Sequence, residues 1–223
     1  MAIQEIVPTA DGSFTLKAAH LDETYHSRHG ALSESAHVFI ENGLKYFLEK
    51  NTPSRLNILE IGFGTGLNAL LAEKFLQENF NGTWQYVGIE PFPPDFRALF
   101  HQGFYPSSLH GPILEALCQG QKKIEIFGKN SGILILDNSL WPSESAQGRF
   151  DVIFYDAFAP SKQPEMWTIL SLEKAFSSLN KGGVWVSYAA QGAMRRNLKQ
   201  AGFHVEKLPG PPGKREMTRA LKL

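Results

Sequence analysis

The sequence has one cysteine, Cys118, among its 223 residues. A single cysteine excludes an intramolecular disulfide and a cysteine-based zinc site, and it fits a reducing compartment. Long apolar runs are also missing, because no stretch approaches the roughly 18 residues of a membrane span. The N-terminus has no basic region followed by an apolar segment. We therefore expect a soluble, cytoplasmic protein with no membrane partner.

An excess of charge of either sign is absent, since 22 lysines and arginines balance 22 aspartates and glutamates. The overall charge therefore gives no reason to expect nucleic acid. The distribution is uneven, however. From Arg195 to the last residue there are eight basic and two acidic residues, a formal charge of +6 against −6 for the rest. This segment either presents a basic face to a polyanion or is a solvated C-terminal element.

The chain also lacks internal repeats and any linker that would divide two large domains. Its length suits one α/β domain with a small appendage. Asp11-Gly12 is a turn dipeptide between two short segments that favour strands, and it predicts a β-hairpin. We therefore expect an N-terminal β appendage over residues 1–24 and a main domain over residues 25–223.

The strongest signal that is present is a glycine-rich turn within residues 56–69, LNILEIGFGTGLNA. An apolar strand pattern leads into Gly62, Gly64 and Gly66, and a helical pattern follows. Glycine takes positive φ readily and has no Cβ, so a ligand can approach the main chain at such a turn. The amides that open the following helix favour a carboxylate or a phosphate. The turn therefore predicts a cofactor site.

Two cofactors compete for this turn. The spacing Gly64-x-Gly66-x-x-Ala69 satisfies the dinucleotide fingerprint. Glu60, however, lies on the strand just before the first glycine, where it would repel a pyrophosphate and attract the ammonium and sulfonium groups of S-adenosylmethionine (SAM). Glu90, at the end of the next predicted strand, fits the ribose hydroxyls of either cofactor. We expect SAM, with a nicotinamide dinucleotide as the alternative.

Further acids follow later strand patterns. Asp156 ends the apolar segment 150–155, and ligands of an open parallel sheet bind outside the carboxyl ends of its strands. Asp156 should therefore face the same crevice as Glu90 and the glycine turn. Asp137 and Asn138 come at the end of another strand pattern, where they either bind an adenine amino group or form a turn.

Aromatic side chains flank the predicted crevice. Phe158 and Trp167 offer flat surfaces on which a base could stack, or they pack into the core. The segment 25–30 is expected to line the mouth of the cofactor site. His26 and His29 lie within it, but no carboxylate or cysteine stands at ligand spacing, so we expect no metal.

Strand and helix patterns alternate along the chain, which favours an α/β fold with a mostly parallel sheet and helices on both faces. Ser33 or Ser35 is expected to cap a helix that runs to about residue 49, and Asp95 to cap a later one. The segment 180–183, Asn-Lys-Gly-Gly, predicts a tight turn before a strand over 184–189.

Three segments together resemble the methyltransferase part of the tRNA 5-methylaminomethyl-2-thiouridine biosynthesis (MnmC) family. They are residues 59–68 (LEIGFGTGLN), residues 156–167, which contain DAFAP and PEMW, and residues 210–217 (GPPGKREM). The glycine turn alone fits any class I SAM-dependent methyltransferase, whereas the other two segments are more restrictive. The resemblance implies the class I methyltransferase fold, which is Rossmann-like. It also implies methylation of the aminomethyl group at C5 of uridine 34, the wobble base of the tRNA anticodon, to give 5-methylaminomethyl(-2-thio)uridine.

On this interpretation Asp156 first orients the acceptor amine toward SAM and acts as a base second. The FAD-dependent half of the two-part family members has no counterpart in the sequence. An NAD(P)-dependent oxidoreductase and a non-catalytic tRNA-binding protein with the same fold are the alternatives. Contacts to SAM are expected from Glu60, Gly62, Gly64, Gly66, Asn68, Glu90 and Asp137. Contacts to the substrate and the tRNA are expected from Tyr25, Phe158, Trp167, Arg195, Arg196, Lys214 and Arg215.

Overall fold

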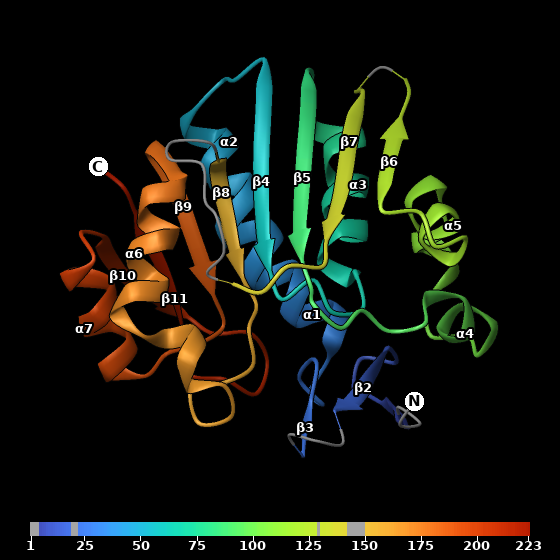
Figure 1. The fold of residues 1–223 in the computed structure, drawn as a ribbon, viewed down its shortest axis with the longest axis horizontal. Helices are drawn as coiled ribbons and strands as arrows, with labels where there is room; N and C mark the ends of the chain where they lie inside the picture. The colour runs from blue at the N-terminus through green and yellow to red at the C-terminus, as the bar shows by residue number, and fades with distance from the viewer. Residues whose placement is uncertain (1–4, 19–21, 129, 142–149) are drawn as a thin grey trace.

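The computed structural model describes residues 5–18, 22–128, 130–141 and 150–223. Within these residues the central sheet has eight strands, in the order β10-β11-β9-β8-β4-β5-β7-β6. Helices cover both faces of this sheet (Figure 1), and the predicted Rossmann-like α/β class is confirmed. The strands are β4 (Arg55–Ile61), β5 (Thr83–Ile89), β6 (Lys123–Ile126), β7 (Gly132–Asp137), β8 (Phe150–Tyr155), β9 (Leu179–Ser187), β10 (His204–Pro209) and β11 (Glu216–Leu221).

The five middle strands, β9, β8, β4, β5 and β7, run parallel. β6 is antiparallel at one edge, and β11 and β10 are antiparallel at the other. After β4, the chain adds β5 and β7 on one side and then β8 and β9 on the other. In open α/β sheets, ligands bind at the carboxyl ends of the strands where the order reverses in this way. The topology therefore directs attention to the carboxyl ends of β4 and β8.

Alternating side chains of the same strands build two cores. Ile58 and Phe154 pack on one face with the helical segment 31–50 and α3, whereas Leu59 and Tyr155 pack on the other face with α6 and α7. A sheet covered on both faces needs such apolar alternation.

Among the described residues, no helix is both long and apolar enough to cross a membrane. The helical elements are α1 (Ala31–Ser35), η1 (Ala36–Lys45), α2 (Tyr46–Lys50), α3 (Leu67–Asn79), α4 (Phe96–His101), η2 (Ser107–Leu109), α5 (Pro112–Cys118), η3 (Pro164–Trp167), α6 (Ile169–Ser178) and α7 (Gly192–Gln200).

The described part of the N-terminal segment forms a separate three-stranded sheet. β1 (Glu5–Pro8) pairs antiparallel with β2 (Phe14–Ala18), and β2 pairs with β3 (Glu23–Thr24). The hairpin predicted at Asp11-Gly12 is thus confirmed. Figure 1 shows this small sheet beyond the carboxyl ends of the central strands, near α1. Residues 1–4 and 19–21 of the predicted appendage lie outside the described residues, and the domain boundary after residue 24 stays a prediction.

The first helical segment begins earlier than its serines predict. α1 begins at Ala31, so Ser33 and Ser35 lie inside it, and the prediction that one of them caps it is wrong. Side chains of the hairpin take that role instead, because Ala31 N donates to Ser13 Oγ at 3.2 Å and Ser33 N to Asp11 Oδ2 at 2.9 Å. These partners are distant in sequence, so no local pattern reveals them. They also fix the hairpin to α1.

The turn predicted over residues 180–183 is found as a bulge inside β9, which already begins at Leu179. The pairing with β8 moves from Phe150–Leu179 to Val152–Val184, and Gly182 has a φ of +79°. Gly182 N donates to Lys222 O at 2.6 Å, and Lys222 N donates to Gly183 O at 3.2 Å. These bonds to the C-terminal end of the chain hold the bulge in place. The cap predicted at Asp95 is confirmed, since Asp95 Oδ1 accepts from Ala98 N at 2.9 Å.

Candidate active site

The glycine-rich turn joins β4 to α3, as predicted. Gly62, Gly64 and Gly66 have φ angles of +88°, +50° and +77°, which residues with a Cβ rarely adopt. The amides of Gly62 and Phe63 donate to Ile89 O at 3.0 and 3.1 Å. The turn is therefore tied to the end of β5, at the carboxyl edge of the sheet.

The space beside two of these glycines is occupied by the protein itself. A Cβ at Gly62 would lie 2.5 Å from the carbonyl oxygen of Asp156, and one at Gly64 would lie 2.9 Å from Tyr25 Cδ1. Gly62 and Gly64 line a cavity, whereas Gly66 is not among the described residues that line it. Their missing Cβ atoms thus let the turn approach Asp156 and Tyr25 at the edge of that cavity.

This cavity, which we term the turn cavity, has a volume of about 360 Å³. Small-molecule sites have volumes of about 300–1,000 Å³ and mostly apolar walls with a few polar groups. The turn cavity has this character, because the Glu90 carboxylate lies among apolar and aromatic side chains. Those side chains are Ile61, Phe63, Ile89, Phe92, Leu140, Trp141, Phe158 and Met166.

Glu90 follows β5 and faces the turn. Its Oε2 accepts a hydrogen bond from Gly64 N at 3.0 Å, and its Oε1 accepts one from Phe92 N at 3.1 Å. Burial raises the pKa of Glu90, although these two amides act in the opposite direction. Glu90 therefore braces the turn and lines the turn cavity at the same time.

Glu60 does not face the cavity, so the prediction that it faces a ligand is wrong. Its side chain is 0% exposed, and its two carboxylate oxygens accept from Asn68 Nδ2 and Tyr86 Oη, each at 2.7 Å. Burial first, and the nearby charge of Asp156 second, raise the pKa of Glu60 well above its usual range. Glu60 is thus a buried support beneath the turn.

Asp156 follows β8 and lines the turn cavity, as predicted. Its Oδ2 accepts from Asn68 Nδ2 at 2.8 Å, so one amide group contacts both Asp156 and Glu60. Burial and the Glu34 charge raise the pKa of Asp156, and the Asn68 hydrogen bond and the Lys214 charge lower it, which leaves it at about 7. A carboxyl group with such a pKa can bind or release a proton near neutral pH.

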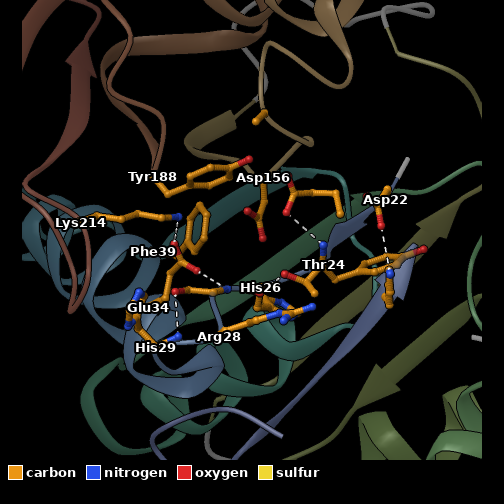
Figure 2. Close-up of a pocket in the computed structure, with 15 residues that line it drawn as sticks. Asp22, Thr24, His26, Arg28, His29, Glu34, Phe39, Asp156, Tyr188 and Lys214 are labelled. Carbon is orange, nitrogen blue, oxygen red and sulfur yellow. Dashed lines mark hydrogen bonds and ion pairs between the residues drawn. The ribbon is translucent and has the colours of Figure 1, made fainter. Parts of the chain in front are cut away.

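A second cavity, of about 540 Å³, is also lined by Asp156, and we term it the loop cavity. Segments far apart in the sequence meet in its wall (Figure 2), namely β2, β3, the segment 25–29, α1 and the loop that carries Lys214. Of the residues that the structure describes, four line both cavities, and these are Tyr25, His26, Asp156 and Tyr188. A ligand in one cavity can therefore meet a ligand in the other at Asp156.

His26 lies in the shared wall but is almost fully buried. Burial is the main reason why its pKa falls to about 4, so the imidazole is neutral at pH 7. Its Nδ1 has no hydrogen-bond partner among the described residues. Within those same residues, no group of three or more His, Cys, Asp and Glu side chains could hold a metal ion.

The predicted aromatic contacts divide into one at the cavity and one in the core. Phe158 lines the turn cavity and packs edge-on against Tyr25, with ring centroids 5.2 Å apart. Trp167 is 4% exposed, packs on Tyr155, and donates from Nε1 to the Phe158 carbonyl oxygen at 2.8 Å. The prediction that Trp167 offers a stacking surface is therefore wrong, because the core already covers its ring.

Asp137 ends β7. It forms a turn there, which is one of the two roles predicted for it. Its Oδ1 accepts from Ser139 N at 2.9 Å, and the Asn138 side chain donates to the Glu90 carbonyl oxygen at 2.7 Å. Asp137 is exposed and is not among the described residues that line either cavity. A contact from Asp137 to adenine stays a prediction without support from this geometry.

The basic C-terminal segment is largely bound to the protein itself. Arg195 is 6% exposed, forms an ion pair with Glu216 at 2.6 Å, and donates to Thr218 Oγ1 at 2.9 Å. Its predicted contact to a phosphate is therefore wrong. Lys214 lines the loop cavity instead of an outer basic face. Of the four predicted cations, Arg196 and Arg215 are the two that stand exposed.

Two residues of the loop cavity were missed by sequence reasoning. Tyr188 follows β9 at its carboxyl end, so the strand-end rule that selected Asp156 could have found it. Glu34 forms an ion pair with Lys214 across 180 positions of sequence. No local pattern reveals such a pair, because it depends on how the chain ends meet.

Comparisons with known proteins agree with this geometry. Residues 116–223 match a family described as S-adenosyl-L-methionine-dependent methyltransferase. The tRNA 5-methylaminomethyl-2-thiouridine biosynthesis bifunctional protein MnmC of Marinomonas sp. (strain MWYL1) is 34% identical over 215 residues, which cover 88% of this chain and 31% of that protein. The MnmC protein of Idiomarina loihiensis is 32% identical over 88% of this chain and 35% of its own length. The chain thus spans about a third of the curated relatives it matches.

Among solved structures, MnmC2 from Aquifex aeolicus superposes with a TM-score of 0.80 at 29% identity, covering 100% of this chain and 71% of that one. Spermidine synthase from Thermotoga maritima superposes with a TM-score of 0.51 at 12% identity, covering 99% of this chain and 69% of that one, and this likeness concerns the fold alone. The family match favours SAM over the dinucleotide alternative. By sequence and by fold, the chain is similar to the MnmC proteins, and its fold is that of the S-adenosyl-L-methionine-dependent methyltransferases.

Proposed function

We propose that this protein transfers a methyl group from SAM to the aminomethyl group at C5 of the wobble uridine, position 34, in tRNA. The observation that carries the proposal is the place of Asp156 in the wall shared by the two cavities. The similar MnmC proteins are named for 5-methylaminomethyl-2-thiouridine biosynthesis in tRNA, which supports an aminomethyl uridine as the acceptor. A tRNA substrate also suits a cytoplasmic location.

The residues of the turn cavity fit SAM. Gly62 and Gly64 bring main chain to the cavity edge, Glu90 offers a carboxylate for ribose hydroxyls, and Phe92 and Leu140 offer apolar surface for a flat base. When bound, SAM supplies a methyl group that is attached to a positively charged sulfur. The sulfur is the leaving group and needs no acid to assist it. The chain's own residues then have to place the acceptor nitrogen and control its proton.

Asp156 is the residue for both tasks. Orientation of reacting groups contributes up to about 7–11 kcal/mol to catalysis. The Asp156 carboxylate can accept a hydrogen bond from the amine, and this bond directs the amine lone pair away from the carboxylate. An aliphatic amine has a pKa near ~10.4 and is mostly protonated at pH 7. With a pKa of about 7, Asp156 is a better proton acceptor than an ordinary aspartate. Removal from water inside the cavity further disfavours the ammonium form of the amine.

The loop cavity is the proposed place for the acceptor base. Bases of single-stranded RNA loops can leave the stack and enter a protein pocket, often against aromatic rings. Tyr25, which lines both cavities, packs edge to face against Phe158 of the turn cavity. The exposed Arg196 and Arg215 are the proposed phosphate contacts. The anticodon loop is the proposed binding partner.

The test is methyl transfer from labelled SAM to tRNA that carries 5-aminomethyluridine at position 34, followed by nucleoside analysis. Labelled 5-methylaminomethyluridine is the expected product with the wild-type protein and not with Asp156→Ala. A protein that binds SAM by calorimetry but labels no tRNA would argue against the proposal. Tight binding of NADH without binding of SAM would favour the oxidoreductase alternative.

A further inference from the structure

One wall of the loop cavity is built around an ion pair between the two ends of the chain. Lys214 Nζ contacts Glu34 Oε1, and Figure 2 shows these side chains on the same wall as Tyr188 and Asp156. The Glu34 side chain is only 6% exposed, and its Oε2 accepts from Ser27 N at 2.7 Å. A carboxylate held in this way fixes the position of its ammonium partner.

The ammonium of Lys214 has a second contact. It lies 3.9 Å from the centroid of the Tyr188 ring, which is a favourable distance for a cation over an aromatic face. Tyr188 is itself fixed, since its hydroxyl donates to the Ala157 carbonyl oxygen at 2.9 Å. Two partners from different parts of the fold therefore hold the Lys214 ammonium in place.

An ammonium group carries three N–H donors. One of them is directed to Glu34, and the ring of Tyr188 faces the group from another side. In the part of the chain that the structure describes, the Lys214 ammonium has no other hydrogen-bond partner, and Lys214 lines the loop cavity. A donor is therefore available to a ligand in that cavity, next to Asp156.

We propose that Lys214 determines which base is methylated, by donating a hydrogen bond to the C4 carbonyl oxygen of a uracil whose C5 aminomethyl group lies at Asp156. This inference rests on the proposed function. C4 and C5 are neighbouring ring atoms, so a base that places its aminomethyl nitrogen at Asp156 presents its C4 substituent to the same wall. Uracil has an acceptor at C4, whereas cytosine has an amino group there, which would oppose the Lys214 donor.

Discrimination of this kind has a known size. A good bidentate contact to a base edge distinguishes it from the wrong base by about 1–3 kcal/mol, which corresponds to about 5-fold to 150-fold in affinity. Lys214 is held by Glu34 and Tyr188 before a ligand arrives, so little side-chain freedom is lost on binding. Glu34 acts through Lys214 and is a positioning residue on this account.

The experiment uses two anticodon stem-loop RNAs that differ at one nucleotide, 5-aminomethyluridine or 5-aminomethylcytidine. For the wild-type protein we expect kcat/KM to be about 5-fold to 150-fold higher for the uridine RNA. In Lys214→Met the uridine value should fall and the cytidine value should change little, so that their ratio approaches one. Lys45→Met, which removes an ion-paired lysine on the outer face of η1, should keep the wild-type ratio.

A wild-type ratio in active Lys214→Met would overturn the inference, and so would a wild-type protein that does not distinguish the two RNAs. SAM affinity serves as the folding control, because Lys214 does not line the turn cavity. If Lys214→Met does not fold, Glu34→Gln replaces it and should reduce the ratio in the same direction. Equilibrium binding of the two RNAs measures the same ratio without turnover. Absence of methylation with intact discrimination in binding would therefore contradict the proposed function and not the role of Lys214.

Discussion

Asn68 Nδ2 lies 2.8 Å from Asp156 Oδ2. Asn68 is 1% exposed and sits in the first turn of α3, directly after the glycine turn. Its amide therefore transmits the position of the turn to the carboxylate that lies between the two cavities. Asn68 itself is not among the described residues that line either cavity, so its predicted contact to SAM has no support from this geometry.

Replacement of Asn68 by alanine should slow methyl transfer more than it weakens SAM binding. A hydrogen bond to a charged group contributes about 1.5–3 kcal/mol, so we expect kcat to fall by about 10-fold or more. Because this hydrogen bond lowers the pKa of Asp156, its loss should move the acidic limb of the rate profile to higher pH. Asn79→Ala, at the exposed end of α3, is the matched control. A weaker SAM affinity with an unchanged pH profile would return Asn68 to the predicted SAM contacts.

Asp156→Asn should stabilise the protein at alkaline pH while it removes activity. The pKa of Asp156 is about 7 in the folded protein and near ~3.9 in an unfolded chain. The folded state thus binds this proton more tightly, and the free energy of unfolding falls as the pH rises between these two values. Asparagine does not ionise, so the Tm of Asp156→Asn should exceed that of the wild type by about 2 °C or more at pH 8. A Tm difference of the same size at pH 4 and pH 8 would contradict this explanation.

Gly64→Ala should weaken SAM binding. The residue has a φ of +50°, and the new Cβ would lie 2.9 Å from the Tyr25 ring, so the turn or Tyr25 has to move. We expect SAM affinity to fall by about 10-fold or more. Gly120→Ala is the control, because Gly120 has a φ of +76° and nothing within 4 Å of its added Cβ. Calorimetry should show weaker SAM binding for the first variant alone, and equal losses would point to general backbone strain.

The sequence predicted the parts of this site that depend on local pattern. The strand ends before Glu90 and Asp156, and the positive φ of Gly62, are properties of short segments and are confirmed by the structure. The predicted orientation of the Glu60 side chain was wrong, because the burial of Glu60 depends on Tyr86, a residue of the neighbouring strand. Alternation along β4 places an acid on one face but does not say what covers that face.

The charged residues show the same limit. Arg195 and Lys214 belong to one basic segment of sequence, yet one lies in a buried network with Thr218 and the other reaches Glu34. Charge counts describe a segment, whereas pairing depends on elements that meet only after folding. The loop cavity therefore could not be predicted from the sequence, since its wall combines residues from both ends of the chain.

Asp11→Ala should destabilise the protein through the start of α1. The Asp11 carboxylate accepts from Ser33 N, and loss of a helix cap costs about 1 kcal/mol. Burial acts to raise its pKa, but hydrogen bonds from Ser13, Ser33 and Thr9 hold it below the usual range. The stabilisation is thus present above about pH 3.9 and is lost as the pH falls through the lower, folded-state value. Urea unfolding at pH 7 should show the loss, and Glu41→Ala, an exposed acid on η1, should change stability by less than about 0.5 kcal/mol.

Arg195→Met should reduce stability and leave the salt dependence of RNA binding unchanged. The guanidinium donates to Thr218 Oγ1 and to the Met217 carbonyl oxygen, each at 2.9 Å, and pairs with Glu216. Loss of these bonds in a buried position should lower the free energy of unfolding by about 2–3 kcal/mol.

Arg196→Ala removes the exposed neighbour on the same helix and should leave stability within about 0.5 kcal/mol. It should reduce the slope of log affinity against log salt for tRNA by about 1. Binding titrations at several salt concentrations separate the two arginines, and a smaller slope in Arg195→Met, with no loss of stability, would restore Arg195 as a phosphate contact.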